Sequence, residues 1–251
     1  MSKIETKDLR VSYKKKSVLE GISLTVNEGE IVTLMGGSGC GKSTLLRSVM
    51  RLIPISGGEV HIDGERIDNL PETKMNEVRK KMGMVFQEGA LFDSMNVREN
   101  VAFALRRHTK MKEREIRSVV RERLDAVGLS GVEEKMPNEL SGGMRRRVGI
   151  ARALALNPEI LFYDEPTAGL DPLLTATIVE LILKMRDRYN ATSVVVTHDI
   201  AAAERVSDRV AMIHEGHLII EGTFTDLRSS HHPHIRSFLD SKVPSIIRCP
   251  S

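Results

Sequence analysis

The sequence IVTLMGGSGCGKSTLL, residues 31–46, decides the fold because it joins three kinds of local structure in one order. Ile31–Met35 carries no charge and no polar alternation, which is typical of a strand buried on both faces. Residues 36–41 form a glycine-rich loop, and residues 42–52 contain helix formers with leucines at 45, 46 and 52. A glycine, four residues and then Gly-Lys-Ser between a strand and a helix is the spacing of a phosphate-binding loop.

This loop is suited to hold the phosphates of a nucleotide. Glycines let successive backbone N–H groups point inward, and the following helix directs its positive end to the same point. The Lys42 ammonium adds a mobile charge for the β- and γ-phosphates, and the Ser43 hydroxyl is placed to ligate Mg²⁺. The alternative is a glycine-rich turn with an incidental lysine. We predict that the nucleotide is bound by Gly36, Gly37, Ser38, Gly39, Cys40, Gly41, Lys42, Ser43 and Thr44.

Two adjacent carboxylates, Asp164 and Glu165, end a second apolar run that begins at Ile160. At the carboxyl edge of a parallel sheet they would lie beside the phosphate loop, where open α/β sheets bind their ligands. Asp164 is then expected to hold Mg²⁺, and Glu165 to orient the attacking water as general base. Taken alone, such a pair could equally be solvated surface, so its assignment depends on the phosphate loop upstream.

A second anion site is predicted at residues 140–144, Leu-Ser-Gly-Gly-Met, which open a helix with Val148, Ala151 and Leu154 on its buried stripe. Ser141 offers a hydroxyl, and the glycines offer free N–H groups at the positive end of the helix. One chain has no evident need for two phosphate sites. The simplest explanation is that this site serves a phosphate held by another copy of the protein.

The rest of the chain predicts an α/β fold. Its core is a P-loop (RecA-like) parallel sheet, with an N-terminal antiparallel β layer and an inserted α-helical subdomain. Strands are expected at 21–26, 59–62 and 82–86, and helical periodicity extends from Asn96 to about Ala155. Strands and helices then alternate to residue 221. We divide the chain into a core of 1–87 and 156–222, a helical subdomain of 88–155 and a C-terminal tail of 223–251.

Composition excludes several classes of protein. The 251 residues carry 37 Lys and Arg against 34 Asp and Glu, and this net charge of +3 gives no sign of a nucleic-acid partner. The longest stretch without a charged side chain, 31–41, is shorter than the roughly 18 to 20 residues of a membrane-spanning helix. The charged N-terminus resembles no secretory signal, and two cysteines, Cys40 and Cys249, fit a reducing compartment.

Nearly the whole chain resembles the ATP-binding subunits of ABC transporters. The resemblance rests on the following motifs, in this order: the phosphate loop, Gln87, Leu140-Ser-Gly-Gly, Asp164-Glu165, Gly169-Leu-Asp171 and Thr197-His198-Asp199. It implies a head-to-tail homodimer that holds two ATP molecules. Each ATP lies between the phosphate loop of one copy and Ser141, Gly142 and Gly143 of the other.

The resemblance also implies roles for individual residues. Tyr13 would stack on adenine beside Val18, Gln87 would ligate Mg²⁺ and sense a membrane partner, and His198 would contact the γ-phosphate. Asp171 would cross the dimer interface to help position the attacking water. The expected metal ligands are therefore Ser43, Gln87 and Asp164, and the expected catalytic residues are Lys42, Glu165, Asp171 and His198.

Simpler interpretations stand beside these. Tyr13 could be a partly buried ring without a ligand, and His198 a capping or core histidine. The basic runs 14–16 and 145–147 are expected to be solvated or to face lipid headgroups. Histidines 231, 232 and 234 lack the carboxylate or cysteine companions of a metal site. Met144 stands where most of the family has Gln, which removes a side-chain amide contact but leaves the donors of 141–143 in place.

Three segments, 89–94 (GALFDS), 140–145 (LSGGMR) and 162–172 (FYDEPTAGLDP), look most like the ATPases of Mce-type (Mla-like) lipid transporters. This similarity implies a permease that docks near residues 87–100, an Mce-domain lipid-binding partner, and a place on the cytoplasmic face of the inner membrane. It also suggests that the tail reaches the other protomer. Apolar Leu91, Phe92 and Met95 fit such a docking groove, although the methionines of this region could instead form a loose core.

Other functions stay open at this point. An ATPase of an amino-acid or other small-solute importer is the nearest alternative. A soluble ABC protein of translation or DNA repair would need paired cassettes or long coiled coils, and neither pattern is present in the sequence. A nucleotide-binding module without hydrolysis would lack the general base, whereas this chain has Glu165.

Overall fold

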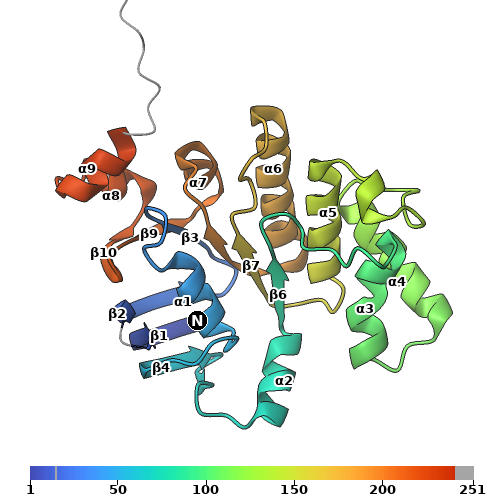
Figure 1. The fold of residues 1–251 in the computed structure, drawn as a ribbon, viewed down its shortest axis with the longest axis horizontal. Coiled ribbons are helices and arrows are strands. Elements are labelled where there is room, and N and C mark those ends of the chain that lie inside the picture. Colours follow the sequence, from blue (N-terminus) through green and yellow to red (C-terminus); the bar gives the residue numbers. More distant parts are fainter. Residues whose placement is uncertain (15, 241–251) are drawn as a thin grey trace, which may run out of the picture.

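The computed structural model describes residues 1–14 and 16–240, and its centre is a six-stranded sheet (Figure 1). The strand order is β10 (His217–Gly222), β9 (Arg209–His214), β3 (Ile31–Met35), β8 (Thr192–Val196), β7 (Ile160–Asp164) and β6 (Met82–Val85). Strands β9 to β6 run parallel to their neighbours, whereas β10 pairs antiparallel with β9. The predicted α/β fold with a parallel core is confirmed.

Strands β3, β7 and β8 are buried along their whole length, as their apolar sequences predict. Alternate side chains of β7 enter different layers of the core. Leu161 and Tyr163 pack in the same cluster as α6 (Pro172–Tyr189), while Ile160 and Phe162 join the cluster that contains α1 (Lys42–Val49). Because both faces are covered by apolar packing, the strand ends are held rigidly, and the site is built on those ends.

A smaller antiparallel sheet forms the predicted N-terminal layer. Its order is β2 (Lys16–Asn27), β1 (Ser2–Tyr13), β4 (Gly57–Ile62) and β5 (Glu65–Arg66). Ile22, Leu24 and Val26 are buried on one face and pack in the cluster that contains Leu45 and Leu46 of α1. The layer therefore lies over the helix that follows the phosphate loop, as Figure 1 shows.

The predicted helical insertion consists of α3 (Val97–His108), α4 (Glu113–Ala126), a 3₁₀ turn (Pro137–Glu139) and α5 (Gly142–Ala153). Asn96 begins α3 with a capping box. Its side chain accepts from the Glu99 N–H at 2.8 Å, and the Glu99 carboxylate accepts from the Asn96 N–H at 3.0 Å. One apolar cluster runs from these helices into β7 and α6, so the insertion shares its core with the sheet. The boundaries at 88 and 155 stay a prediction.

Three features of the helices differ from the sequence prediction. Helix α1 ends at Val49 rather than Leu52, because Arg51 adopts a left-handed φ of 53° and Leu52 is 50% exposed. Helix α2 (Glu72–Lys80) was not predicted, since Met75 is its only buried side chain. The expected tail from Thr223 contains two helices, α8 (Phe224–Ser229) and α9 (Pro233–Asp240), anchored by buried Leu227 and Ile235.

Residues 241–251, which include Cys249 and the end of the expected tail, lie outside the described residues. Within the described ranges, no helix combines the length and the apolar composition needed to cross a bilayer.

Strand register brings the predicted motifs to one edge of the sheet. Leu34 of β3 and Asp164 of β7 both pair with Val196 of β8, and Val85 of β6 pairs with Tyr163. The phosphate loop, Gln87, Glu165 and His198 therefore leave the sheet at the same level. Because β8 separates β3 from β7, His198 emerges between the phosphate loop and the two carboxylates.

Candidate active site

The loop after β3 has a conformation that only its glycines allow. Gly36, Gly39 and Gly41 have φ values of 142°, 77° and 112°. A Cβ atom on Gly36 would lie 2.2 Å from the Ile213 carbonyl oxygen, and one on Gly41 would lie 2.5 Å from Leu19 Cδ2. Side chains at these two positions would therefore both strain the backbone and collide with the fold.

Lys42, the first residue of α1, turns its side chain back over this loop. Its Nζ donates to the carbonyl oxygens of Gly36 and Gly37, each at 2.9 Å, and the side chain is buried. Cys40 Sγ lies 3.9 Å from the same ammonium. A charge is thus held at the centre of the loop, where the phosphates of a nucleotide would bind.

Ser43 and Asp164 meet across the sheet edge. Ser43 Oγ donates to Asp164 Oδ1 at 2.8 Å, and an Arg47 guanidinium nitrogen lies 3.8 Å from Oδ2. Gln87 and Ser43 line one cavity, which is described below. Hydroxyl, carboxylate and amide oxygens are the hard donors that Mg²⁺ prefers, so the side chains present fit this ion.

Glu165 and His198 form the second pair of the site. Glu165 Oε2 lies 2.9 Å from His198 Nδ1, and because an ionised carboxylate has no hydrogen to give, Nδ1 is the donor. Glu165 has a φ of 53°, a left-handed conformation that costs a non-glycine residue about 1–3 kcal/mol. Its N–H donates to the Val196 carbonyl oxygen at 2.9 Å, which helps to hold this conformation. The carboxylate is mostly shielded from solvent, whereas the imidazole is half-exposed.

Most of these groups, but neither Asp164 nor Cys40, line a cavity of about 610 Å³, which is an ordinary volume for a small-molecule site. The residues that line it are Gly36, Gly37, Ser38, Gly39, Gly41, Lys42, Ser43, Thr44, Gln87, Glu165, Ala168, His198 and Phe238. Ala168 and Phe238 were not predicted. No local motif marks either residue, although the apolar spacing of Ile235, Phe238 and Leu239 could have indicated α9.

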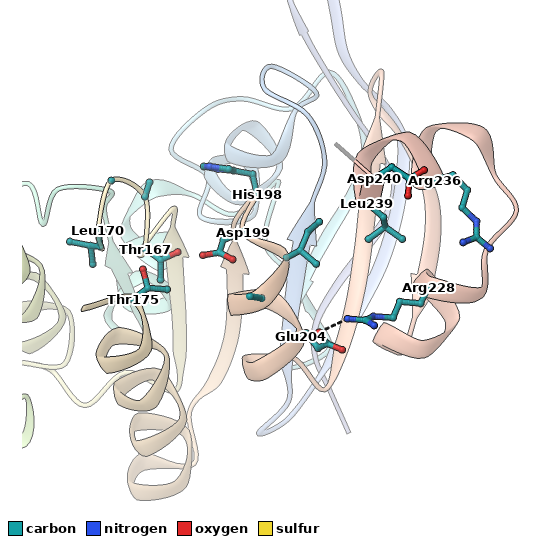
Figure 2. Close-up of a pocket in the computed structure, with 14 residues that line it drawn as sticks. Thr167, Leu170, Thr175, His198, Asp199, Glu204, Arg228, Arg236, Leu239 and Asp240 are labelled. Carbon is teal, nitrogen blue, oxygen red and sulfur yellow. Dashed lines mark hydrogen bonds and ion pairs between the residues drawn. The ribbon is translucent and has the colours of Figure 1, made fainter. Parts of the chain in front are cut away.

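A neighbouring cavity of about 810 Å³ shares Ala168 and His198 with the first. Figure 2 shows His198 and Asp199 on one side of it and the C-terminal residues Arg236, Leu239 and Asp240 on the other. An ion pair of 2.7 Å between Arg228 and Glu204 joins α8 to α7 (Ile200–Val206) along its wall (Figure 2). Helices α8 and α9 thus lie beside the cavity that the phosphate loop lines.

Other predicted site residues lie outside that cavity. Tyr13, at the end of β1, is 49% exposed. Val18 lies beside the phosphate loop, because its carbonyl oxygen would be 3.1 Å from a Cβ atom placed on Gly41. Ser141 caps α5, because its Oγ accepts from the Met144 N–H at 3.3 Å. Asp171 caps α6 by accepting from the Leu174 N–H at 2.9 Å. Ser141, Gly142 and Asp171 are exposed.

The expectation that the basic run 145–147 is solvated is wrong for its central residue. Arg146 is only 5% exposed, and burial lowers the pKa of its guanidinium. Its Nε donates to the Gln87 carbonyl oxygen at 2.6 Å and another of its nitrogens donates to the Ala168 carbonyl oxygen at 2.5 Å. Helical periodicity did not mark this burial, because position 146 lies on the side of α5 that packs against residues 87–90, away from the predicted apolar stripe.

The histidines of the C-terminal region do gather, but without metal-site geometry. The rings of His214 and His234 stack with centroids 3.7 Å apart, and His232 lies 5.6 Å from His234. Among the residues that the structure describes, no group of three or more His, Cys, Asp or Glu side chains is arranged to hold a metal ion.

Comparisons with known proteins agree on one family. The family profile described as "ABC transporter" matches residues 19–168. A protein of Mycobacterium leprae named as a probable ribonucleotide transport ATP-binding protein is 43% identical over 95% of this chain and 69% of its own length. The intermembrane phospholipid transport ATP-binding protein MlaF of Escherichia coli K12 is 39% identical over 94% of this chain and 88% of its own length.

Solved structures of ATP-binding cassettes have the same fold. One, described as a dimeric cassette in a post-hydrolysis state with ADP and phosphate bound, is 34% identical with a TM-score of 0.81. It covers 88% of this chain and 98% of its own. A cassette of Clostridium perfringens, described as part of the cbiONQ transporter complex, is 30% identical with a TM-score of 0.84. It covers 97% of this chain and 96% of its own.

Proposed function

The chain belongs to the ABC transporter family as an Mla-like ATPase, and from this premise we propose that it drives lipid transport through a separate permease. As an ABC ATPase it binds ATP and hydrolyses it to ADP and phosphate. The observation that carries the residue assignments is the 2.9 Å contact between Glu165 and His198 in the cavity that the phosphate loop lines.

In the proposed mechanism, Glu165 takes the proton of the attacking water. The carboxylate is mostly shielded from solvent and is oriented by the Nδ1–H of His198. With a hydrogen on Nε2 as well, the same ring would donate to an oxygen of the γ-phosphate. Lys42 neutralises charge on the β- and γ-phosphates, and the N–H groups of the loop bind their oxygens. Ser43, Gln87 and Asp164 would hold Mg²⁺, which neutralises charge on the phosphates when bound.

We assign the second half of each site to a partner copy. Ser141 and Gly142 are exposed at the start of α5 and do not line the cavity of their own chain. A head-to-tail dimer would bring them to the γ-phosphate held by the partner's loop, with Asp171 at the interface. The dimeric state of the related cassettes supports this arrangement. Tyr13 and Val18 are proposed to contact the adenine.

Cys40 provides a test of the nucleotide assignment. The thiol is partly buried behind the loop, 3.9 Å from Lys42 Nζ, so an alkyl group there would displace the ammonium. In a Cys249→Ser background, a thiol-alkylating reagent is expected to abolish most ATPase activity, and saturating ATP to protect it. Cys40→Ala should be active and insensitive to the reagent. Full activity after complete alkylation of Cys40 would contradict the assignment.

A groove beside the cavity is proposed as the permease docking site. It has a volume of about 430 Å³ and is lined mainly by apolar side chains: Met82, Gly83, Met84, Phe86, Ala90, Phe92, Phe103, Ala104, Arg152, Ala153 and Leu156. Phe92 and Phe103 are 43% and 44% exposed, with ring centroids 5.0 Å apart. An apolar surface of this kind fits the apolar face of a short helix from a membrane subunit.

The lipid substrate is supported by the MlaF relatives, of which this chain covers most of the length. We further propose an Mce-domain lipid-binding partner and a place on the cytoplasmic face of the inner membrane, held there by the permease. The mycobacterial relatives carry the name of a ribonucleotide transporter, which makes a small-solute importer the second candidate.

Affinity purification of the tagged chain from native membranes separates these candidates. Recovery of an Mce-domain protein with the permease is expected, whereas recovery of a periplasmic solute receptor would overturn lipid transport. Phe103→Glu should lose both partners, because it places a charge in the groove, and should retain basal ATPase activity; Phe103→Leu is its matched control. Undiminished recovery with Phe103→Glu would refute the docking site.

A further inference from the structure

Arg146 of α5 reaches the two loops that flank the nucleotide cavity. Its Nε donates to the Gln87 carbonyl oxygen at 2.6 Å, and a terminal nitrogen donates to the Ala168 carbonyl oxygen at 2.5 Å. Gln87 and Ala168 both line the cavity, and they follow different strands of the sheet. One side chain of the helical subdomain is therefore hydrogen-bonded to both sides of the site.

The backbone beside this contact is packed too closely to adjust easily. A Cβ atom on Gly89 would lie 2.6 Å from the Arg145 carbonyl oxygen, and one on Gly149 would lie 2.8 Å from Gly89 Cα. The loop after Gln87 thus lies directly on α5. Movement of α5 relative to the sheet must move this loop, and through Arg146 it must also move the loop at Ala168.

Burial of Arg146 is energetically costly, which suggests that the guanidinium is retained for a reason other than packing. Burial lowers the pKa of the guanidinium, and the charge of Glu88 acts in the opposite direction. The third guanidinium nitrogen is buried and has no hydrogen-bond partner among the described residues. A buried polar group is costly unless it is hydrogen-bonded, and the bonds that compensate here are those to the Gln87 and Ala168 carbonyl oxygens.

We propose that Arg146 is a positioning residue that fixes the Gln87 and Ala168 loops to α5, so that they move together with Ser141 and Gly142. The proposal rests on the function above, because it assumes that Gln87 ligates Mg²⁺ and that the start of α5 faces a partner's ATP. Arg146 itself would contact neither the Mg²⁺ ion nor the partner's ATP. It sets the position of Gln87 relative to Asp164, and of the loop that leads to Asp171.

Arg123 of α4 provides the matched control. It is only 3% exposed, and its Nε donates to the Leu154 carbonyl oxygen at the end of α5 at 3.0 Å. Neither Arg123 nor Leu154 lines the nucleotide cavity or the proposed docking groove. A general loss of packing or charge in the helical subdomain should affect both arginines, whereas loss of loop positioning should affect Arg146 alone.

The test compares Arg146→Met, Arg146→Lys and Arg123→Met in the full-length protein. For Arg146→Met we expect kcat to fall about 10- to 100-fold, the size that small misplacements of catalytic groups produce. Half-maximal activity should need more Mg²⁺, while ATP affinity measured in EDTA stays unchanged. Arg146→Lys should behave alike, because one ammonium cannot replace the two-armed contact. Arg123→Met should keep the wild-type kcat and Mg²⁺ dependence.

Two results would overturn the proposal: wild-type kcat and Mg²⁺ dependence in Arg146→Lys, or equal losses in Arg146→Met and Arg123→Met. If Arg146→Met does not fold, Arg146→Lys decides by the same readouts. Failure of the underlying function is recognised separately, because ATP hydrolysis by the wild type would then not depend on Glu165.

Discussion

Glu165→Gln is expected to retain ATP binding and to lose roughly 10²- to 10⁴-fold in the rate of hydrolysis, the usual contribution of a general base. Glutamine has the shape of glutamate, so it can keep the 2.9 Å contact with His198 Nδ1 and the strained backbone at φ 53°. It cannot accept the proton of the attacking water. The loss should therefore appear in kcat and not in the affinity for ATP.

Steady-state phosphate release and equilibrium binding of a fluorescent ATP analogue measure the two quantities. Glu88→Gln is the control, because Glu88 is an exposed carboxylate that follows Gln87 and does not line the cavity. It should keep the wild-type rate. Undiminished turnover in Glu165→Gln would remove Glu165 from the mechanism and leave His198 without a catalytic partner.

The residues of this pair were predictable because they belong to short linear motifs at strand ends. A glycine loop, an Asp-Glu pair and a Thr-His-Asp segment each follow an apolar run, and the sheet register carries all three to one edge. The order in which the three strands lie across the sheet was not predicted. The sequence does not encode in any local pattern that β8 lies between β3 and β7, so the position of His198 between the loop and Glu165 emerged from the structure.

Residues whose roles depend on tertiary contacts were harder to predict. A run of three arginines favours a solvated Arg146, yet the close approach of Gly89 and Gly149 buries it against Gln87. Phe238 lines the cavity from a short helix of a segment that we expected to be a tail. In both cases the deciding contact joins segments far apart in the chain, and single-sequence periodicity carries no information about such contacts.

The proposed head-to-tail dimer predicts that Gly142→Asp strongly impairs ATP hydrolysis and ATP-dependent dimerisation. Gly142 is the first residue of α5, and a Cβ atom there would meet nothing within 4 Å. An aspartate in the first turn of a helix is favourable for the helix itself. The substitution should therefore leave the isolated fold intact, and any harm must come from a group outside the chain.

In the proposed head-to-tail dimer that group would be the γ-phosphate held by the partner's loop, which the new carboxylate would repel. We expect ATP-dependent dimerisation to be lost and hydrolysis to fall roughly 10²-fold or more, because preorganised donors to the phosphate are replaced by a like charge. Binding of ATP to the phosphate loop of the monomer should stay within a few-fold of wild type. Light scattering after size-exclusion chromatography, in the Glu165→Gln background, measures the ATP-dependent dimer.

Gly142→Ala is the matched control, since it adds the same Cβ without charge and should reduce hydrolysis far less than Gly142→Asp. Gly143 is unsuitable, because a Cβ there would lie 3.3 Å from Leu174 Cδ2 and would disturb the chain's own packing. Gly142→Asp that dimerises and hydrolyses ATP normally would refute a site shared between copies. Loss of ATP binding by the Gly142→Asp monomer would instead place Ser141 and its neighbours at the nucleotide of their own chain.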